Sequence, residues 1–209
     1  MNRKVKVLVL GLGILLLLAL VSTMLGYFGG QGNESGSPLS TRVTVRPEDT
    51  VEEISGLLPP FTLRDLILHS DAIVIGRVTD ILPAKHGVLP DGNSIIYTDV
   101  IVQADRYLYG EPESEQIAIQ VWGGRIGDIV MLAEDEAVFT LGEAIVVFLG
   151  RPPYELGPIP DGIDPLSYYR VTGACLGKFA YRCGIACRFP CKIVTICVIE
   201  KIVAKIKDR

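Results

Sequence analysis

The sequence predicts a mainly β protein: a small antiparallel OB-like barrel, or a sandwich, of five to six strands with one short helix, preceded by an N-terminal transmembrane helix. Short segments that alternate apolar and polar residues, Gly- and Pro-rich loops between them, and an uncharged apolar run near the N-terminus lead to this prediction. The order of these features predicts six regions: a cytoplasmic stub at 1–6, a transmembrane anchor at 7–28, a flexible linker at 29–40, a lead-in segment and helix at 41–69, the β-barrel domain at 70–180, and a Cys-rich basic tail at 181–209.

The N-terminal run from Val7 to Phe28 has no charged residue. As a helix it would extend about 33 Å, enough for a hydrocarbon core of roughly 30 Å. Arg3, Lys4 and Lys6 precede it, so the positive-inside rule predicts a single-pass protein of the cell membrane with the bulk of the chain extracytoplasmic. A cleaved signal peptide is the alternative, although the run is long and no A-x-A site follows it. Asn33, in the sequon "NES" of the linker, is a candidate glycosylation site.

The charge distribution bears on the partners of the protein. Residues 31–180 carry 10 basic and 22 acidic groups, whereas residues 181–209 carry 7 basic and 2 acidic groups. Because phosphate binding needs clustered Lys and Arg, the acidic body argues against nucleic acid as a partner. The membrane, through Val7–Phe28, and an envelope protein or polymer are the partners we expect.

The lead-in contains one candidate strand and the single short helix. Residues 42–45 have β-forming character. In "PPFTLRDLILHSD" Thr62 is a candidate N-cap and Asp65 stands three residues later, as in a capping box, while Leu63, Leu66 and Ile67 form an apolar stripe.

Four strands are predicted in the domain, followed by a hairpin. The strands span 72–82, 94–110, 115–124 and 144–150, and the hairpin spans 167–181 around Gly173 and Gly177. Periodicity does not separate a barrel from a sandwich, so both stay open.

A resemblance covers residues 70–179. The pieces "SDAIVIGRVTDI", "IYTDVIVQADRYLYGE", "WGGRIGD", "FTLGEAIVVFLG" and "YRVTGACLGKF" follow in an order that resembles an uncharacterised small β-barrel domain of prokaryotic secreted and membrane-anchored proteins. The resemblance implies a fold and an extracytoplasmic location. It implies no activity and no site residues.

The five cysteines all lie near the C-terminus, at Cys175, Cys183, Cys187, Cys191 and Cys197. Their spacing matches neither the paired C-x2–4-C ligands of zinc sites nor an iron–sulfur run, so we predict no metal and no cofactor. Disulfides, free thiols or no defined role remain open, and a turn near "RFPC" would bring Cys183 or Cys187 toward Cys197. The tail from 192 to 209 fits either an amphipathic helix on a membrane surface, with Ile196, Ile199, Val203 and Ile206 on one side, or an added edge strand.

No nucleophile–base or metal motif appears in residues 72–174, so we predict no catalytic, cofactor-binding or metal residues. The hypothesis favoured is a membrane-anchored extracytoplasmic binding or structural module of the cell envelope. The alternative is a thiol enzyme resembling a sortase-type transpeptidase, or a metal or disulfide redox protein that uses the C-terminal cysteines. In the transpeptidase, Cys175 would be the nucleophile, His69 or His86 the acid/base, and Arg182 or Arg188 the oxyanion stabiliser.

Overall fold

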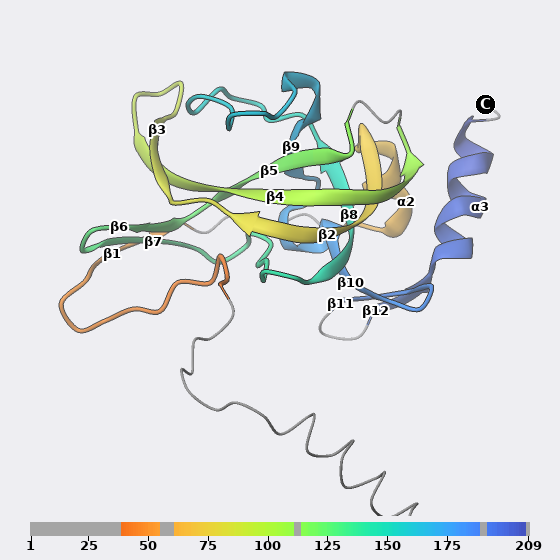
Figure 1. The fold of residues 1–209 in the computed structure, drawn as a ribbon, viewed down its shortest axis with the longest axis horizontal. Coiled ribbons are helices and arrows are strands. Elements are labelled where there is room, and N and C mark those ends of the chain that lie inside the picture. The colour runs from red at the N-terminus through yellow and green to blue at the C-terminus, as the bar shows by residue number, and fades with distance from the viewer. Residues whose placement is uncertain (1–38, 55–60, 111–113, 189–191, 208–209) are drawn as a thin grey trace, which may run out of the picture. The chain divides into compact units, whose positions relative to one another are not determined.

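The computed structural model describes residues 39–54, 61–110, 114–188 and 192–207 (Figure 1). Within them the chain is mainly β, as predicted, with one large sheet and a smaller three-stranded sheet. A second helix, α3 (Ile196–Lys207), accompanies the short one that the sequence predicts. The elements in chain order are β1 (Thr50–Ile54), α2 (Leu63–Leu68), β2 (Ala72–Ile81), β3 (Lys85–Val88), β4 (Ser94–Tyr109), β5 (Gln116–Trp122), β6 (Gly124–Ile126), β7 (Ile129–Ala133), β8 (Ala144–Gly150), η1 (Pro165–Ser167), β9 (Tyr168–Val171), η2 (Ala174–Gly177), β10 (Lys178–Arg182), β11 (Ile185–Arg188), β12 (Lys192–Thr195) and α3 (Ile196–Lys207).

The four predicted strands are confirmed to within two residues at each end as β2, β4, β5 and β8. Alternation along β4 buries Val100 and Val102 in an apolar cluster that also holds Ile119 of β5 and Val147 of β8. Burying an aliphatic side chain of this size stabilises the fold by about 1.5–3 kcal/mol. The cluster therefore fixes which side chains of β4 and β5 face the other way.

Five strands of the large sheet form a closed set of pairings, because β9 pairs with both β5 and β8. β2 pairs antiparallel with both β4 and β8, and β4 pairs antiparallel with β5. The last strand of this group, β9, pairs in parallel with β5 and antiparallel with the end of β8. The apolar cluster takes side chains from all five strands, so it lies on the side that they enclose.

Strong curvature of β2 and β4 accompanies this arrangement (Figure 1). The register between the two strands shifts at three places along β2. At one of them, a Cβ on Gly76 would lie 2.5 Å from the carbonyl oxygen of Gln103. Only glycine fits so close to the neighbouring backbone, and irregularities of this kind bend and twist a strand pair.

The lead-in segment differs from its prediction. Residues 42–45 form no strand; the strand is β1, which pairs in parallel with β7 in the smaller sheet. Separate contacts hold this segment. Thr41 N donates to Phe139 O at 2.9 Å, and Arg125 donates two hydrogen bonds of 2.5 and 2.6 Å to the Asp49 carboxylate. Isolated contacts of this kind produce no periodic pattern in the sequence.

The helix α2 confirms the predicted capping box. Thr62 N donates to the Asp65 carboxylate at 2.9 Å, and Asp65 N donates to Thr62 Oγ1 at 3.2 Å. These bonds satisfy two amide groups that the first helical turn leaves unpaired. Leu66 and Ile67 are buried, as the apolar stripe predicts.

The predicted hairpin at 167–181 is wrong. β9 and β10 do not pair with each other; β9 lies between β5 and β8, whereas β10 pairs with the first half of β8. The turn η2 separates them, preceded by Gly173 in the left-handed region at φ 69°. The glycines that suggested a tight hairpin therefore redirect the chain from one part of β8 to the other.

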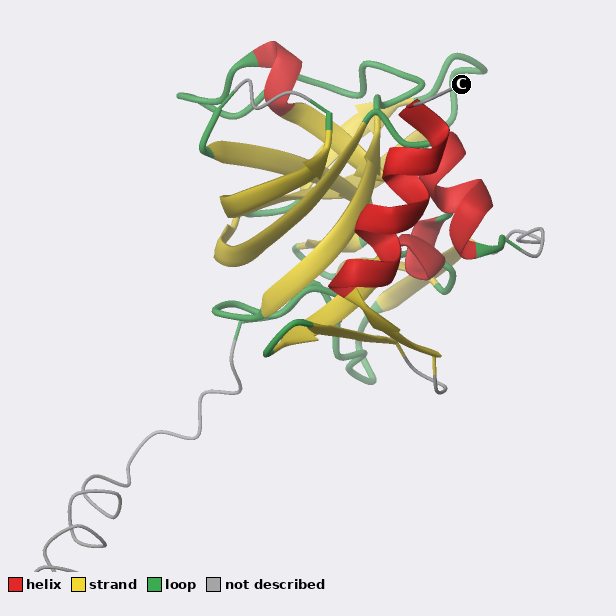
Figure 2. Cartoon of the chain, turned by 90° about the vertical axis from the view of Figure 1, so that its right-hand side faces the viewer, coloured by secondary structure: helices red, strands yellow, loops and turns green. Residues whose placement is uncertain are grey.

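The tail contains both of the predicted structures in succession. β11 and β12 extend the large sheet beyond β10, and α3 follows directly. Ile196, Ile199 and Val203 of α3 are buried in an apolar cluster with Leu66 and Ile67 of α2, and Figure 2 shows the helices on one side of the strands. The apolar stripe expected to meet a membrane surface thus packs against the protein, and the expected boundary at residue 181 falls inside β10.

No helix within the residues that the structure describes has the length and apolar character needed to cross a bilayer. The predicted anchor at 7–28 and the candidate glycosylation site Asn33 lie outside the described residues.

Candidate ligand-binding site

The strands β4, β5 and β9 present a second row of side chains, which we call the outer face, on the side opposite the enclosed apolar cluster. Cross-strand pairing places Asp99 beside Gln120, and Gln120 beside Arg170. The outer face consists of Tyr97, Asp99, Ile101, Ala118, Gln120, Trp122, Tyr168 and Arg170.

The segment 151–167 covers much of the outer face. Its Ile163 packs in one apolar cluster with Ile101 and Ala118, and its Leu156 packs in another with Tyr97. Asp99 and Gln120 are consequently buried, although one face of a strand that alternates in this way usually meets water. The cover leaves polar groups of β4 and β5 beneath an irregular segment.

A hydrogen-bonded network lies at the centre of the outer face. The side chain of Asp99 has no exposed surface, and Lys85 Nζ of β3 lies 2.9 Å from its Oδ2. The Tyr168 hydroxyl donates to Asp99 Oδ1 at 2.7 Å and accepts a hydrogen bond of 2.9 Å from Gln120 Nε2. A buried carboxylate is tolerated when paired and hydrogen-bonded in this way. Burial, and then the neighbouring Asp99, raise the pKa of Tyr168, which keeps the phenol protonated and able to donate.

The sequence contains one signal of this network, the isolated acidic residue Asp99. Asp99 stands within "SIIYTDVIV". Apart from Asp99 and Thr98, all residues from Ile95 to Val102 are apolar or aromatic. A lone acid in such a strand either faces solvent or is buried with partners. The partners themselves are not apparent, because Tyr168 lies 69 residues away and Lys85 sits in a four-residue strand that the sequence does not predict.

A cleft of about 570 Å³ opens beside the network. Lys85 of β3, Ile101 of β4 and Ile163 of the covering segment line it. The remaining lining residues are Thr79, Asp80, Leu82, Gln116, Pro160 and Asp161. The cleft thus combines apolar side chains with hydroxyl, amide and carboxylate groups.

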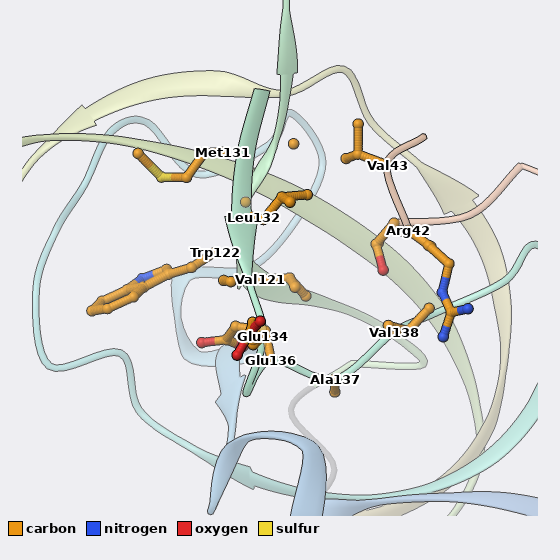
Figure 3. A pocket seen from close by; sticks show the side chains of 14 residues that line it. Arg42, Val43, Val121, Trp122, Met131, Leu132, Glu134, Glu136, Ala137 and Val138 are labelled. Carbon is orange, nitrogen blue, oxygen red and sulfur yellow. The ribbon is translucent and has the colours of Figure 1, made fainter. Parts of the chain in front are cut away.

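A second, smaller cavity of about 250 Å³ lies at the other end of β5 (Figure 3). Figure 3 shows Arg42 and Val43 of the lead-in segment across from Val121 and Leu132. Glu136, which also lines it, pairs with Arg170 of the outer face.

The same end of the outer face holds an aromatic contact. The Arg170 guanidinium lies 4.2 Å from the centroid of the Trp122 ring. Burial raises the pKa of Glu136 and the Arg170 charge opposes that rise. Arg170 therefore links two residues that line the cavity, Trp122 and Glu136, while Arg170 Nε and Trp122 Nε1 are buried without a hydrogen-bond partner among the described residues.

The four described cysteines, Cys175, Cys183, Cys187 and Cys197, are free thiols, and Cys191 lies outside the described residues. Across the described part of the chain, no group of three or more His, Cys, Asp or Glu residues could hold a metal ion. Cys175, in η2, is half-buried, and burial together with Asp135 raises the pKa of its thiol. A nucleophilic cysteine needs the opposite shift.

The other residues of the thiol-enzyme hypothesis are dispersed. His69 ends α2, with Nδ1 2.8 Å from Asp65 O and its ring edge-on to Phe61. His86 is on β3, paired with Ile96 of β4, and Arg182 is exposed at the end of β10. Arg188 does reach η2, where it donates to Leu176 O beside Cys175. Of the predicted group, the structure therefore links only Arg188 with the Cys175 turn.

No protein-family model matches this chain, and no curated protein matches it either.

Proposed function

We propose that the protein is a membrane-anchored, extracytoplasmic binding module of the cell envelope, and that its ligand occupies the cleft beside Asp99. The observation that carries this proposal is the position of the cleft, which lies over β4 and β5 between β3 and the covering segment.

The strand pairings support an OB-like barrel as the scaffold. Two antiparallel neighbours for β2, and a last strand parallel to β5 and antiparallel to β8, are the pairings that such a barrel requires. OB-folds bind oligonucleotides and oligosaccharides on the face of their second and third strands, between the first and the last connecting loops. By this correspondence those strands are β4 and β5, and the loops are residues 82–93 and the covering segment 151–167. The cleft takes lining residues from all four.

The charges of the cleft favour a neutral ligand. Among the described residues that line it, Lys85 is the only basic one, and its charge is balanced by Asp99. Asp80 and Asp161 add negative charge, which repels phosphate groups. The hydroxyl of Thr79 and the amide of Gln116 can exchange hydrogen bonds with sugar hydroxyls. We therefore favour an uncharged envelope polysaccharide over a nucleic acid or a phosphate-bearing polymer.

Binding can be measured directly with the full-length protein in detergent micelles. Calorimetric titration with neutral oligosaccharides released from the cell envelope should give saturable binding, and a single-stranded DNA oligonucleotide should give none. Gln116→Ala should weaken binding about five- to tenfold, the loss of one hydrogen bond of about 1 kcal/mol. Gln103→Ala is the matched control, because Gln103 pairs with Gln116 across the strands but does not line the cleft. Equal effects of the two substitutions, or no saturable binding, would contradict the proposal.

The topology has a separate test. Protease added to intact cells should shorten the protein to a small membrane-bound stub, because the anchor precedes all of the described residues. Protection of the whole chain until the cells are lysed would contradict the extracytoplasmic location.

A further inference from the structure

Two cysteines of the tail flank one end of the pairing of β11 with β12. The register pairs Ala186 with Val194 and Ile185 with Thr195. It then continues one step beyond the named strands, because Ile196 N donates to Gly184 O at 3.0 Å. Cys183 and Cys197 are the next residues along the chain from this hydrogen-bonded pair: Cys183 lies in the turn that precedes β11, and Cys197 lies in the first turn of α3.

The position of the two cysteines suits a disulfide. The hydrogen bond between Gly184 and Ile196 holds the two backbones together at the end of the β11–β12 ladder. Cys183 and Cys197 are each one residue away from this contact, in the turn before β11 and in the first turn of α3. A disulfide requires Cα atoms about 4.4–6.8 Å apart, and a small adjustment of the exposed turn can bring the two cysteines into this range.

Both thiols are also accessible. Ala186, Val194 and Ile196 are buried against the apolar cluster that includes α2, whereas Ile185 and Ile193, on the alternate positions, are exposed. Cys183 and Cys197, which flank this end of the ladder, are both exposed and free. Neither therefore needs to pass through the core to reach the other.

The backbone at Cys183 is fixed by a tight turn. Cys183 and Gly184 form the two-residue turn between β10 and β11, with φ of 47° and 81°. Two-residue hairpin turns of this kind require positive φ at both positions, which is common for Gly and Asn but unfavourable for Cys. The turn thus places a cysteine directly beside the residue that bonds to Ile196.

The other described cysteines are placed differently. The cross-strand neighbours of Cys187 are Ala180 and Ile193. Cys175 lies in η2, where its amide donates to Asp135 O. The geometry points to an intramolecular disulfide between Cys183 and Cys197, which fastens the start of α3 to the β10–β11 turn.

The oxidation requires a disulfide-bearing oxidant, either a small molecule or a protein. The thiolate of one cysteine attacks the oxidant disulfide and forms a mixed disulfide, and one oxidant thiol leaves. The thiolate of the other cysteine then attacks the protein sulfur of that mixed disulfide and releases the second oxidant thiol. The two cysteines lose two electrons and two protons, which the two oxidant thiols carry. In the cell this reaction rests on the proposed extracytoplasmic location, where disulfides persist.

Peptide mapping tests the bond in the full-length protein taken directly from its membrane. Free thiols are alkylated under acid, and the protein is digested with trypsin without reduction. Cleavage after basic residues separates peptide 183–188, which contains Cys183 and Cys187, from peptide 193–201, which contains Cys197. The expected result is a linkage between these two peptides that Cys187→Ser and Cys191→Ser retain and that Cys183→Ser and Cys197→Ser abolish.

A second experiment tests the disulfide independently of the cellular location of the protein. Protein purified under reducing conditions is exposed, still folded, to glutathione disulfide and mapped in the same way. If the same linkage forms here but is absent from protein taken from cells, the bond is supported and the extracytoplasmic location is contradicted. If Cys183 and Cys197 stay free in this experiment, or if either pairs with Cys175, Cys187 or Cys191 or with another chain, the proposed bond is wrong.

Discussion

The Tyr168 hydroxyl lies 2.7 Å from Oδ1 of Asp99, a carboxylate with no exposed surface. This contact joins β9 to β4, two strands that do not pair with each other in the described sheet. The outer face thus has its own polar core, distinct from the apolar cluster on the enclosed side.

Tyr168→Phe should destabilise the fold by about 1–3 kcal/mol, because it leaves a buried carboxylate oxygen without its donor. It also removes the acceptor of Gln120 Nε2. The measurement is the free energy of unfolding in urea. Tyr154→Phe, at a residue 41% exposed, is the control and should stay within about 0.5 kcal/mol of the parent. If the two variants unfold at the same urea concentration, the network does not stabilise the fold.

The strands of the domain were predictable because their period is local. The alternation in 94–110 and the β-branched run in 72–82 each predict a buried strand from the residues of that segment alone. The lead-in was not predictable for the same reason, since its anchor is a contact between Asp49 and Arg125, 76 residues apart. The candidate site also depends on contacts between residues that are distant in the sequence. Lys85, Asp99 and Tyr168 come from three strands and share no motif.

The lead-in should detach at low pH. Two hydrogen bonds from Arg125 lower the pKa of Asp49 to about 2, against about 3.9 for an unfolded aspartate. Because the folded pKa is the lower one, the contribution of this pair is complete above about pH 4 and is lost as the pH falls toward 2. Hydrogen exchange of residues 41–54, followed from pH 5 to pH 2, should show protection that decreases over this interval.

Asp49→Asn should remove this pH-dependent step and leave the segment weakly protected at every pH. Glu53→Gln, at an exposed position on β1, is the matched control and should keep the step. An unchanged profile in Asp49→Asn would show that the backbone pairing of β1 with β7 holds the segment without the ion pair.

Labelling should distinguish a binding module from a thiol enzyme. The raised pKa of the Cys175 thiol and its partial burial predict slow reaction with iodoacetamide at pH 7, slower than at the exposed Cys187. Timed labelling of the folded protein, followed by peptide mapping, measures both rates in one sample. Faster labelling of Cys175 than of Cys187 would favour the transpeptidase-like alternative and reverse our ranking of the two functions.

The tail should be necessary for the stability of the domain, contrary to what its distinct composition suggests. Ile199 of α3 has no exposed surface and packs with Leu66 of α2 and Phe148 of β8. Ile199→Ala should therefore cost about 2–5 kcal/mol, the range for truncating a buried isoleucine. Urea unfolding that reports on the whole domain, such as far-ultraviolet circular dichroism, is the appropriate measurement, because it detects whether the strands unfold together with the helix.

Val198, one residue earlier and 44% exposed, provides the matched control. Val198→Ala changes helix propensity and apolar surface in the same turn, but leaves no cavity in the cluster, so its effect should stay within about 0.5 kcal/mol. If Ile199→Ala frays α3 while the strands keep the parent unfolding midpoint, the tail is an appendage and not part of the core. If both substitutions are silent, the contact of α3 with the sheet does not persist in solution.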